Sequence, residues 1–208
     1  MILSFFIKEK WSEFISQAQN PLAVVESEGW RVRALTETES ITQGGESGFT
    51  GFLARQSDVP VTSFEPDRAQ EAAALLRKFS KEQIEYYYFA RIIAQWHRMK
   101  NRPSVEEFAI WHLEQYKQTL HWDDFDFSIQ HMRIIHQTLF GSFGGALDLN
   151  NVGWFDLIKN PTQEKNPLRE VVQASGEYRD AHIIDGIRNA WKEKKNDVFV
   201  VYGSGQEV

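Results

Sequence analysis

The stretch DVFVVYGSGQEV, residues 197–208, decides which class of fold the chain adopts. Its segment 198–202 is a continuous run of β-branched and aromatic residues, which is typical of a buried strand. The run opens into Gly-Ser-Gly at 203–205, where a backbone without bulky side chains can approach a ligand closely. Because ligands of open α/β sheets bind beyond the carboxyl ends of the strands, we expect a site where this strand ends.

Apolar patterning predicts two more strands and several helices. The runs 22–26 and 59–64 predict short buried strands. Helical spacing predicts helices over 3–18, from about Glu46 after the polar stretch 36–45, and over 178–194. The expected inner face of the second helix is Phe49, Phe52, Leu53 and Gln56. Four further helices are expected over 67–79, 81–99, 105–116 and 127–140, followed by a glycine-rich loop over 141–153.

This order of elements predicts an α/β fold, with a mixed β-sheet core, flanking helices and a largely helical insertion at about 67–140. The chain has 208 residues, of which 42% are hydrophobic and 25% charged, and this length suits one continuous core. We therefore expect a single domain over residues 1–208.

Composition excludes several classes of function. The net charge is −6 and the basic residues are scattered, so nucleic acid is not an expected partner. Cysteine is absent, which excludes disulfides, thiolate metal ligands and cysteine nucleophiles. The apolar opening, residues 1–7, is too short for a signal peptide, and no apolar run approaches the roughly 18 residues of a membrane span. We expect a cytoplasmic protein.

Three glutamates occupy positions where the pattern predicts a site. Glu26 and Glu65 each close a predicted strand at its carboxyl end, where α/β folds place their chemistry. Glu46 lies on the inward face of the helix that it begins. Simpler explanations exist: a strand end also meets water, and a carboxylate in a first helical turn is favourable to the helix dipole.

Two arginines also interrupt the pattern. Arg91 lies on an otherwise apolar stripe of the helix 81–99, where a buried guanidinium needs a partner such as a carboxylate. Its alternative is a packed stem with the charge in solvent. Arg179 opens the last helix and would point toward the strand ends if that inner face continues backwards, although an isolated arginine there is also an ordinary surface charge.

Common catalytic motifs are missing from the sequence. His131 and His136 are five residues apart, about 140° around a helix, so they do not share a face. The histidines alone therefore make no metal site. No phosphate-binding loop and no Gly-x-Ser-x-Gly elbow is present, so nucleotide binding and serine hydrolysis lack support.

Four segments together resemble one superfamily. They are VVESEG (24–29), GESGF (45–49), LARQSDVPVTSFEPD (53–67) and YRDAHIIDGIRNAWKEKKNDVFVVYGSG (178–205). The resemblance is to the TraB/TIKI-like superfamily, which includes erythromycin esterase-like proteins and ChaN-like haem-binding proteins. It implies an α/β core and, in TIKI-like members, metal-dependent peptide hydrolysis. By the same resemblance Glu26, Glu46 and Glu65 match acidic site positions, Arg179 matches the arginine before the final helix, and Arg91 matches more loosely.

Two departures from the family pattern change this expectation. Members carry two Gly-x-x-His motifs, but here Gly203 and Gly205 are followed by Gln206, whose amide is a poorer metal ligand than imidazole. The first motif would lie on a strand before the helix 3–18. We therefore expect a metal-dependent hydrolase domain that is incomplete or inactive as given, with residues 203, 205 and 206 contacting a small-molecule or peptide substrate.

The alternative is a ligand-binding module without turnover, holding haem or iron as ChaN-like proteins do. The aromatic-rich segment 86–122 could cover such a ligand, although core packing also explains these aromatics. A strand missing from the sheet would leave a neighbouring edge exposed, so we also expect self-association.

Overall fold

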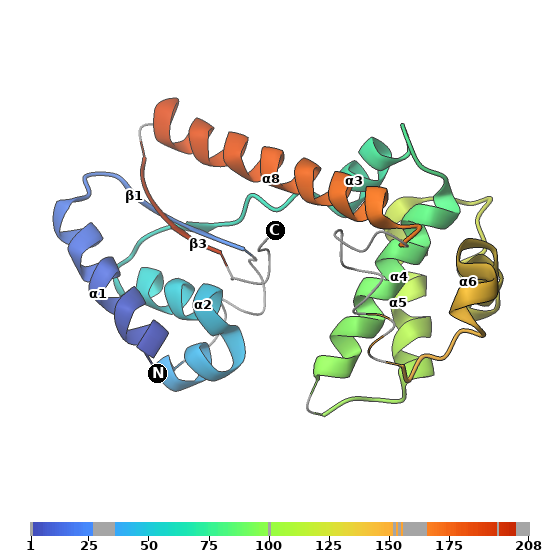
Figure 1. The fold of residues 1–208 in the computed structure, drawn as a ribbon. Helices are drawn as coiled ribbons and strands as arrows, with labels where there is room; N and C mark the ends of the chain where they lie inside the picture. Colours follow the sequence, from blue (N-terminus) through green and yellow to red (C-terminus); the bar gives the residue numbers. More distant parts are fainter. Residues whose placement is uncertain are drawn as a thin grey trace. The chain divides into compact units, whose positions relative to one another are not determined.

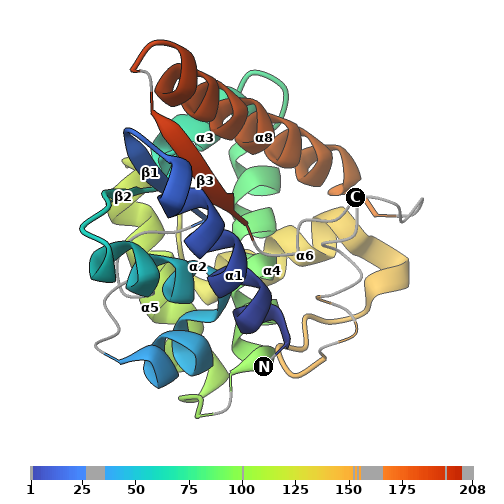
Figure 2. The same cartoon turned by 90° about the vertical axis from the view of Figure 1, so that its left-hand side faces the viewer.

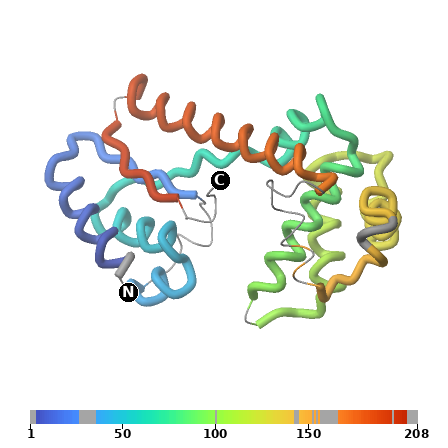
Figure 3. Tube along the Cα trace, in the orientation of Figure 1, coloured from blue at the N-terminus to red at the C-terminus, as the bar shows by residue number. Residues whose placement is uncertain are grey.

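A computed structural model describes residues 2–26, 36–99, 101–151, 153, 155, 166–194 and 196–202. The chain divides into two compact units: unit 1 is Met1–Pro66 with Asp180–Val208, and unit 2 is Asp67–Arg179. Figure 3 follows the chain out of unit 1, through unit 2 and back along helix α8 (Arg169–Lys192), which contributes to both. A compact unit is not by itself an independent domain, so the single domain over 1–208 stays a prediction.

The described sheet belongs to unit 1 and has three parallel strands. They are β1 (Pro21–Val25), β2 (Val61–Thr62) and β3 (Asp197–Val201), in the order β2-β1-β3. Ala23 of β1 pairs with Val61 on one side and with Phe199 on the other. The combination of helices and sheet agrees with the sequence, but the described pairs are all parallel where we expected a mixed sheet, and the protein is mostly helical.

Helices cover both faces of this small sheet (Figure 1). On one face α1 (Ile2–Gln17) and α2 (Glu37–Gln56) form a core of Ile7, Trp11 and Phe49 against Ala23. Trp11 meets Phe199 of β3 edge-on, with ring centroids 5.2 Å apart. The part of α8 that belongs to unit 1 lies on the other face. Successive residues of a strand point to opposite faces of the sheet, so they face either α1 and α2 or α8.

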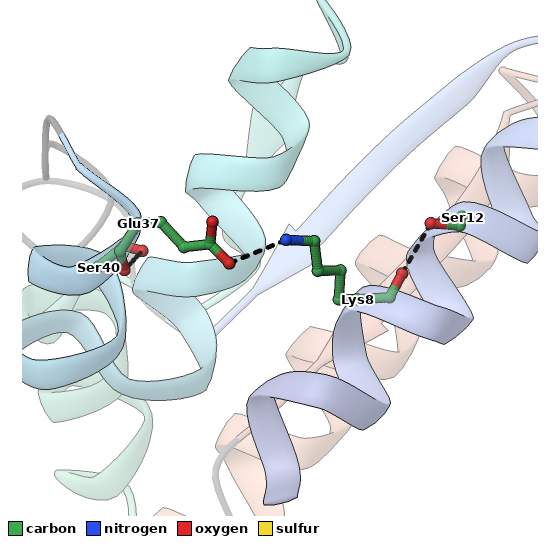
Figure 4. A network of polar contacts seen from close by, with 4 residues as sticks. All are labelled: Lys8, Ser12, Glu37 and Ser40. Carbon is green, nitrogen blue, oxygen red and sulfur yellow. Dashed lines mark hydrogen bonds and ion pairs between the residues drawn. The ribbon is translucent and has the colours of Figure 1, made fainter. Parts of the chain in front are cut away.

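Helices α1 and α2 also meet through surface charges, as Figure 4 shows. Lys8 Nζ of α1 lies 3.0 Å from Glu37 Oε1 of α2. Both side chains are about half exposed, at 54% and 46%, so solvent screens the pair and it stabilises unit 1 little. The apolar contacts of Trp11 and Phe49 dominate this helix pair.

Helix α2 (Glu37–Gln56) begins nine residues before the helix expected from about Glu46. Thr36 and Glu39 form a reciprocal capping box, so the polar stretch 36–45 starts a helix rather than preceding one. Gly45 has a positive φ of 57° and kinks the helix, and the expected amphipathic half follows it. Phe49 and Leu53 are buried as expected, but Gln56 is exposed because it lies in the last turn.

Other boundaries differ from the expectation as well. Strand β2 pairs over Val61–Thr62 alone, not over 59–64. Helix α6 (Ile129–Gly144) continues past Phe140 through a kink at Gly141, where we expected a loop. Helix α8 begins at Arg169 instead of residue 178. Helices α6 and α8 are longer than expected because adding a turn to an existing helix costs less than starting a new helix, even where that turn is polar or contains glycine.

Unit 2 consists of helices around a buried central helix. They are α3 (Arg68–Leu75), α4 (Lys81–Arg98), α5 (Val105–Leu120), α6 and the first part of α8. Helix α4 packs against both α5 and α6 (Figure 2). The expected breaks between helices are confirmed, since Asp67, Ser80, Ser104 and Ser128 each cap the helix that follows.

The aromatic-rich segment 86–122 mostly packs in the core of unit 2. Tyr86 and Phe89 are fully buried, and Tyr116 and Trp122 are nearly so. This agrees with core packing as the reason for these aromatics. Within the described residues, no helix is both long enough and apolar enough to span a bilayer.

Candidate functional site

Polar residues from all three strands meet at the carboxyl end of the sheet in unit 1. Glu26 follows β1, Ser63 and Glu65 follow β2, and Tyr202 follows β3. The Ser63 hydroxyl donates a hydrogen bond to the Glu26 carbonyl at 3.1 Å and accepts one from the Glu65 N–H at 3.2 Å. We call these four residues the strand-edge cluster. Parallel strands bring them together because their carboxyl ends share one edge.

Tyr202 is a member of this cluster whose pKa is raised. Burial, followed by the negative charge of Glu65, raises the pKa of Tyr202 to about 12, and Glu26 adds to the effect. Ser63 and the Phe64 backbone oppose the shift, but neither reaches hydrogen-bonding geometry with the hydroxyl, which has no such partner among the described residues. Near neutral pH the hydroxyl is therefore protonated and available to donate a hydrogen bond.

The structure brings only part of the predicted site together. Glu26 and Glu65 share the strand-edge cluster. Glu46 is half-buried just after the kink in α2, and its carboxylate makes no hydrogen bond or ion pair with another described residue. Arg91 and Arg179 belong to unit 2. The gathering of all five around one hollow stays a prediction.

The predicted substrate-contacting residues Gly203, Gly205 and Gln206 lie outside the described residues. Sequence reasoning missed Ser63 and Tyr202, although a signal for Tyr202 was present. It is the only residue of the run 198–202 with a hydroxyl, and it stands where the strand ends.

Unit 1 also has a groove, at the other end of the sheet. Its volume is about 540 Å³, and it lies near the start of β3, on the side away from the strand-edge cluster. Its lining is Phe14, Gln17, Ala18, Ile187, Trp191, Asp197 and Val198. Asp197 is already engaged there, because its carboxylate accepts hydrogen bonds from the backbone N–H groups of Gln19 and Asn20.

A second polar cluster lies inside unit 2 and forms a chain of hydrogen bonds. Arg91 Nη1 donates to the Tyr87 hydroxyl at 3.3 Å, and Tyr87 donates to Ser175 Oγ at 2.9 Å. Ser175 in turn donates to the carboxylate of Glu71. Ser175 and Glu71 are 0% and 5% exposed. The hydroxyls of Tyr87 and Ser175 therefore connect the half-buried guanidinium of Arg91 on α4 with the buried carboxyl group of Glu71 on α3.

Arg68 and Glu85 extend this cluster. The Arg68 guanidinium lies over the rings of Tyr88 and Tyr116, at 5.0 and 4.5 Å from their centroids. Glu85 is 0% exposed, and neither carboxylate oxygen has a hydrogen-bond partner among the described residues; the same is true of the Tyr88 hydroxyl. Burial raises the pKa of Glu85 well above its usual value, although the charge of Arg68 acts against this.

We call these residues together the polar layer of unit 2: Arg68, Glu71, Glu85, Tyr87, Tyr88, Arg91, Tyr116 and Ser175. Burying unpaired polar groups costs stability, so such a layer in an apolar core marks a candidate functional site. Sequence reasoning found only Arg91. A signal for Glu85 was present, because it lies within the otherwise apolar and aromatic run 84–90.

The described side chains do not form a metal-binding set. In those parts of the chain, no three His, Asp or Glu side chains converge in a way that could hold an ion. The strand-edge cluster contributes two carboxylates, fewer than the three protein ligands of ordinary catalytic metal sites. We therefore derive no chemical step through a metal ion.

Comparison with known proteins adds no relative: no family model, curated protein or solved structure matches the chain. The resemblance to the TraB/TIKI-like superfamily accordingly stays a prediction from the four sequence segments given above.

Proposed function

We propose that this chain is a TraB/TIKI-like hydrolase domain of the peptidase type, with its reaction site at the strand-edge cluster of unit 1. The observation that supports the proposal is that Glu26, Glu65 and Tyr202 follow three parallel strands at one edge, with both carboxylates influencing the Tyr202 hydroxyl. Two carboxylates and a neutral hydroxyl donor are sufficient for acid–base hydrolysis of an acyl bond.

The chemistry divides between the two kinds of group. One carboxylate accepts a proton from water as the water attacks the carbonyl carbon, and the proton is then passed to the leaving amine. The Tyr202 hydroxyl donates a hydrogen bond to the oxygen on which negative charge develops. The resemblance also implies a divalent ion, but the described side chains do not form a metal-binding set, so no step of this reaction is assigned to one. Gln206 in place of the family's histidine predicts slow turnover.

The test measures cleavage of a mixture of peptides by mass spectrometry. We expect slow cleavage by the wild-type protein and a loss of about tenfold or more in kcat/KM for Glu65→Gln, Glu26→Gln and Tyr202→Phe. Because the pKa of Tyr202 is about 12, the rate should show no alkaline decline from tyrosine ionisation between about pH 8 and 10.

Glu13→Gln is the matched control. Glu13 is a carboxylate of α1 in unit 1 and is 58% exposed in a pair with Lys10, so its replacement should leave the rate unchanged. Full wild-type rates for both Glu26→Gln and Glu65→Gln would refute the proposal, as would the absence of any cleavage by the wild-type protein.

A further inference from the structure

Arg91 is a half-buried cation of unit 2, with no directly paired carboxylate in the part of the chain that the structure describes. Its neighbours on α4, Ala90 and Ile92, are 1% and 4% exposed, so the side chain emerges from an apolar helix. Among the described residues its guanidinium makes one hydrogen bond, to the Tyr87 hydroxyl, and lies 5.5 Å from the centre of the same ring. A guanidinium has five N–H donors in one plane, so most donors of Arg91 make no hydrogen bond to a described residue.

The chain of hydrogen bonds from Glu71 through Ser175 and Tyr87 fixes the orientation of the Arg91 guanidinium. Tyr87 donates its only proton to Ser175, and Ser175 donates its own to Glu71. The tyrosine oxygen therefore turns its lone pairs toward Arg91 and accepts from Nη1. Tyr87, and then Glu71, raise the pKa of Arg91, so the guanidinium remains charged. Glu71 and Ser175 thus orient Arg91 without contacting it.

The charges of the polar layer do not balance near neutral pH. Arg68 and Arg91 are both cations. Glu71 accepts a hydrogen bond from Ser175 through its carboxyl oxygen, whereas burial favours the neutral form of Glu85. Two positive charges then face one negative charge. A single monoanion placed on the free donors of Arg91 would restore neutrality, while a phosphate dianion would exceed it.

We propose that Arg91 is the centre of an anion-binding site in unit 2 that takes a carboxylate group, and that Tyr87, Ser175 and Glu71 are positioning residues for its guanidinium. A carboxylate matches the planar donor pair of a guanidinium in a bidentate arrangement. The proposal rests on unit 2 alone, so it can fail or succeed independently of the hydrolase proposal.

The experiment is a titration of the full chain with N-acetylglycine, a monocarboxylate with a peptide-like body, followed by the NMR signal of the Arg91 Nε–H group. We expect saturable shifts. For Arg91→Met, binding is followed through backbone amides of α4, and the dissociation constant should rise about tenfold or more because the bidentate partner is lost. Arg77→Met, which removes an exposed arginine of the same unit, should leave the affinity unchanged.

The positioning role has its own readout. Ser175→Ala should weaken binding by about three- to tenfold while Arg91 stays charged, and Ser175→Thr, which keeps the hydroxyl, should restore it. Thermal unfolding of each variant separates loss of affinity from loss of structure. Equal affinity in wild-type protein and Arg91→Met would overturn the site. Saturable binding of inorganic phosphate with no response to N-acetylglycine would overturn its assignment to carboxylates.

Discussion

Glu85→Met is expected to stabilise unit 2 at pH 7, by about 1 to 3 kcal/mol. Glu85 is fully buried on α4, and its two carboxylate oxygens have no hydrogen-bond partner among the described residues. Methionine has a similar length and no group that requires hydration, so it removes this cost while filling the same space. Arg68 attracts the charged carboxylate, but desolvation is the larger effect on its pKa.

The gain in stability from Glu85→Met should increase as the pH rises. The unfolded chain releases the Glu85 proton near its usual pKa of 4.5, whereas the folded protein retains it to higher pH. The folded state therefore loses stability as the pH rises above about 4.5, until the folded pKa is reached. The advantage of Glu85→Met should be smallest near pH 4 and should grow toward pH 7. Native-state hydrogen exchange of α4 amides measures this free energy locally.

Glu82→Met, on the same helix, is the matched control. Glu82 is exposed in the first turn of α4, and a hydrogen bond with Ser80 is the main reason that its pKa is lowered. Its contribution is present above the usual carboxyl pKa and is lost as the pH falls, so Glu82→Met should destabilise unit 2 at pH 7. A Glu85→Met protein less stable than wild type at pH 7 would show that the buried carboxyl stabilises the fold.

Apolar patterning predicted the elements that carry the cores. Runs or stripes of apolar residues predicted the positions of strands β1 and β3 and of helices α1, α4 and α5. These segments are readable because burial imposes a period of 2 or 3.6 on the side chains. The first half of α2 has no apolar stripe, so periodicity could not reveal it. Its capping residues, Thr36 and Glu39, were the available signal.

The candidate sites were less predictable than the fold. Glu26 and Glu65 could be expected at one edge because each follows a strand, and parallel strands end together. The polar layer of unit 2 was not readable in this way. Glu71 and Ser175 are 104 residues apart, and their hydrogen bond depends on the packing of α8 within that unit. Local sequence patterns carry no information about such a pairing.

Gly186→Ala is expected to destabilise unit 1 by about 1 to 3 kcal/mol, although alanine normally favours a helix over glycine by about 1 kcal/mol. Gly186 lies in α8, where a Cβ atom would come within 2.4 Å of Phe64 Cγ and 2.8 Å of Phe64 Cβ. The Cβ atom of Phe64 cannot move away by side-chain rotation, so relief requires α8 and the segment after β2 to separate. Hydrogen exchange of β1 amides in Gly186→Ala reports the loss.

Two comparisons isolate this contact as the cause. Gly176 lies in the same helix, where an added Cβ atom would meet no neighbouring group within 4 Å, so Gly176→Ala should stabilise its own unit by up to about 1 kcal/mol. Phe64→Ala introduced together with Gly186→Ala should cost less than the two separate changes combined, because it removes the atoms that the new methyl group meets. Strict additivity would show that α8 tolerates the methyl group, and that close approach to Phe64 does not require glycine at position 186.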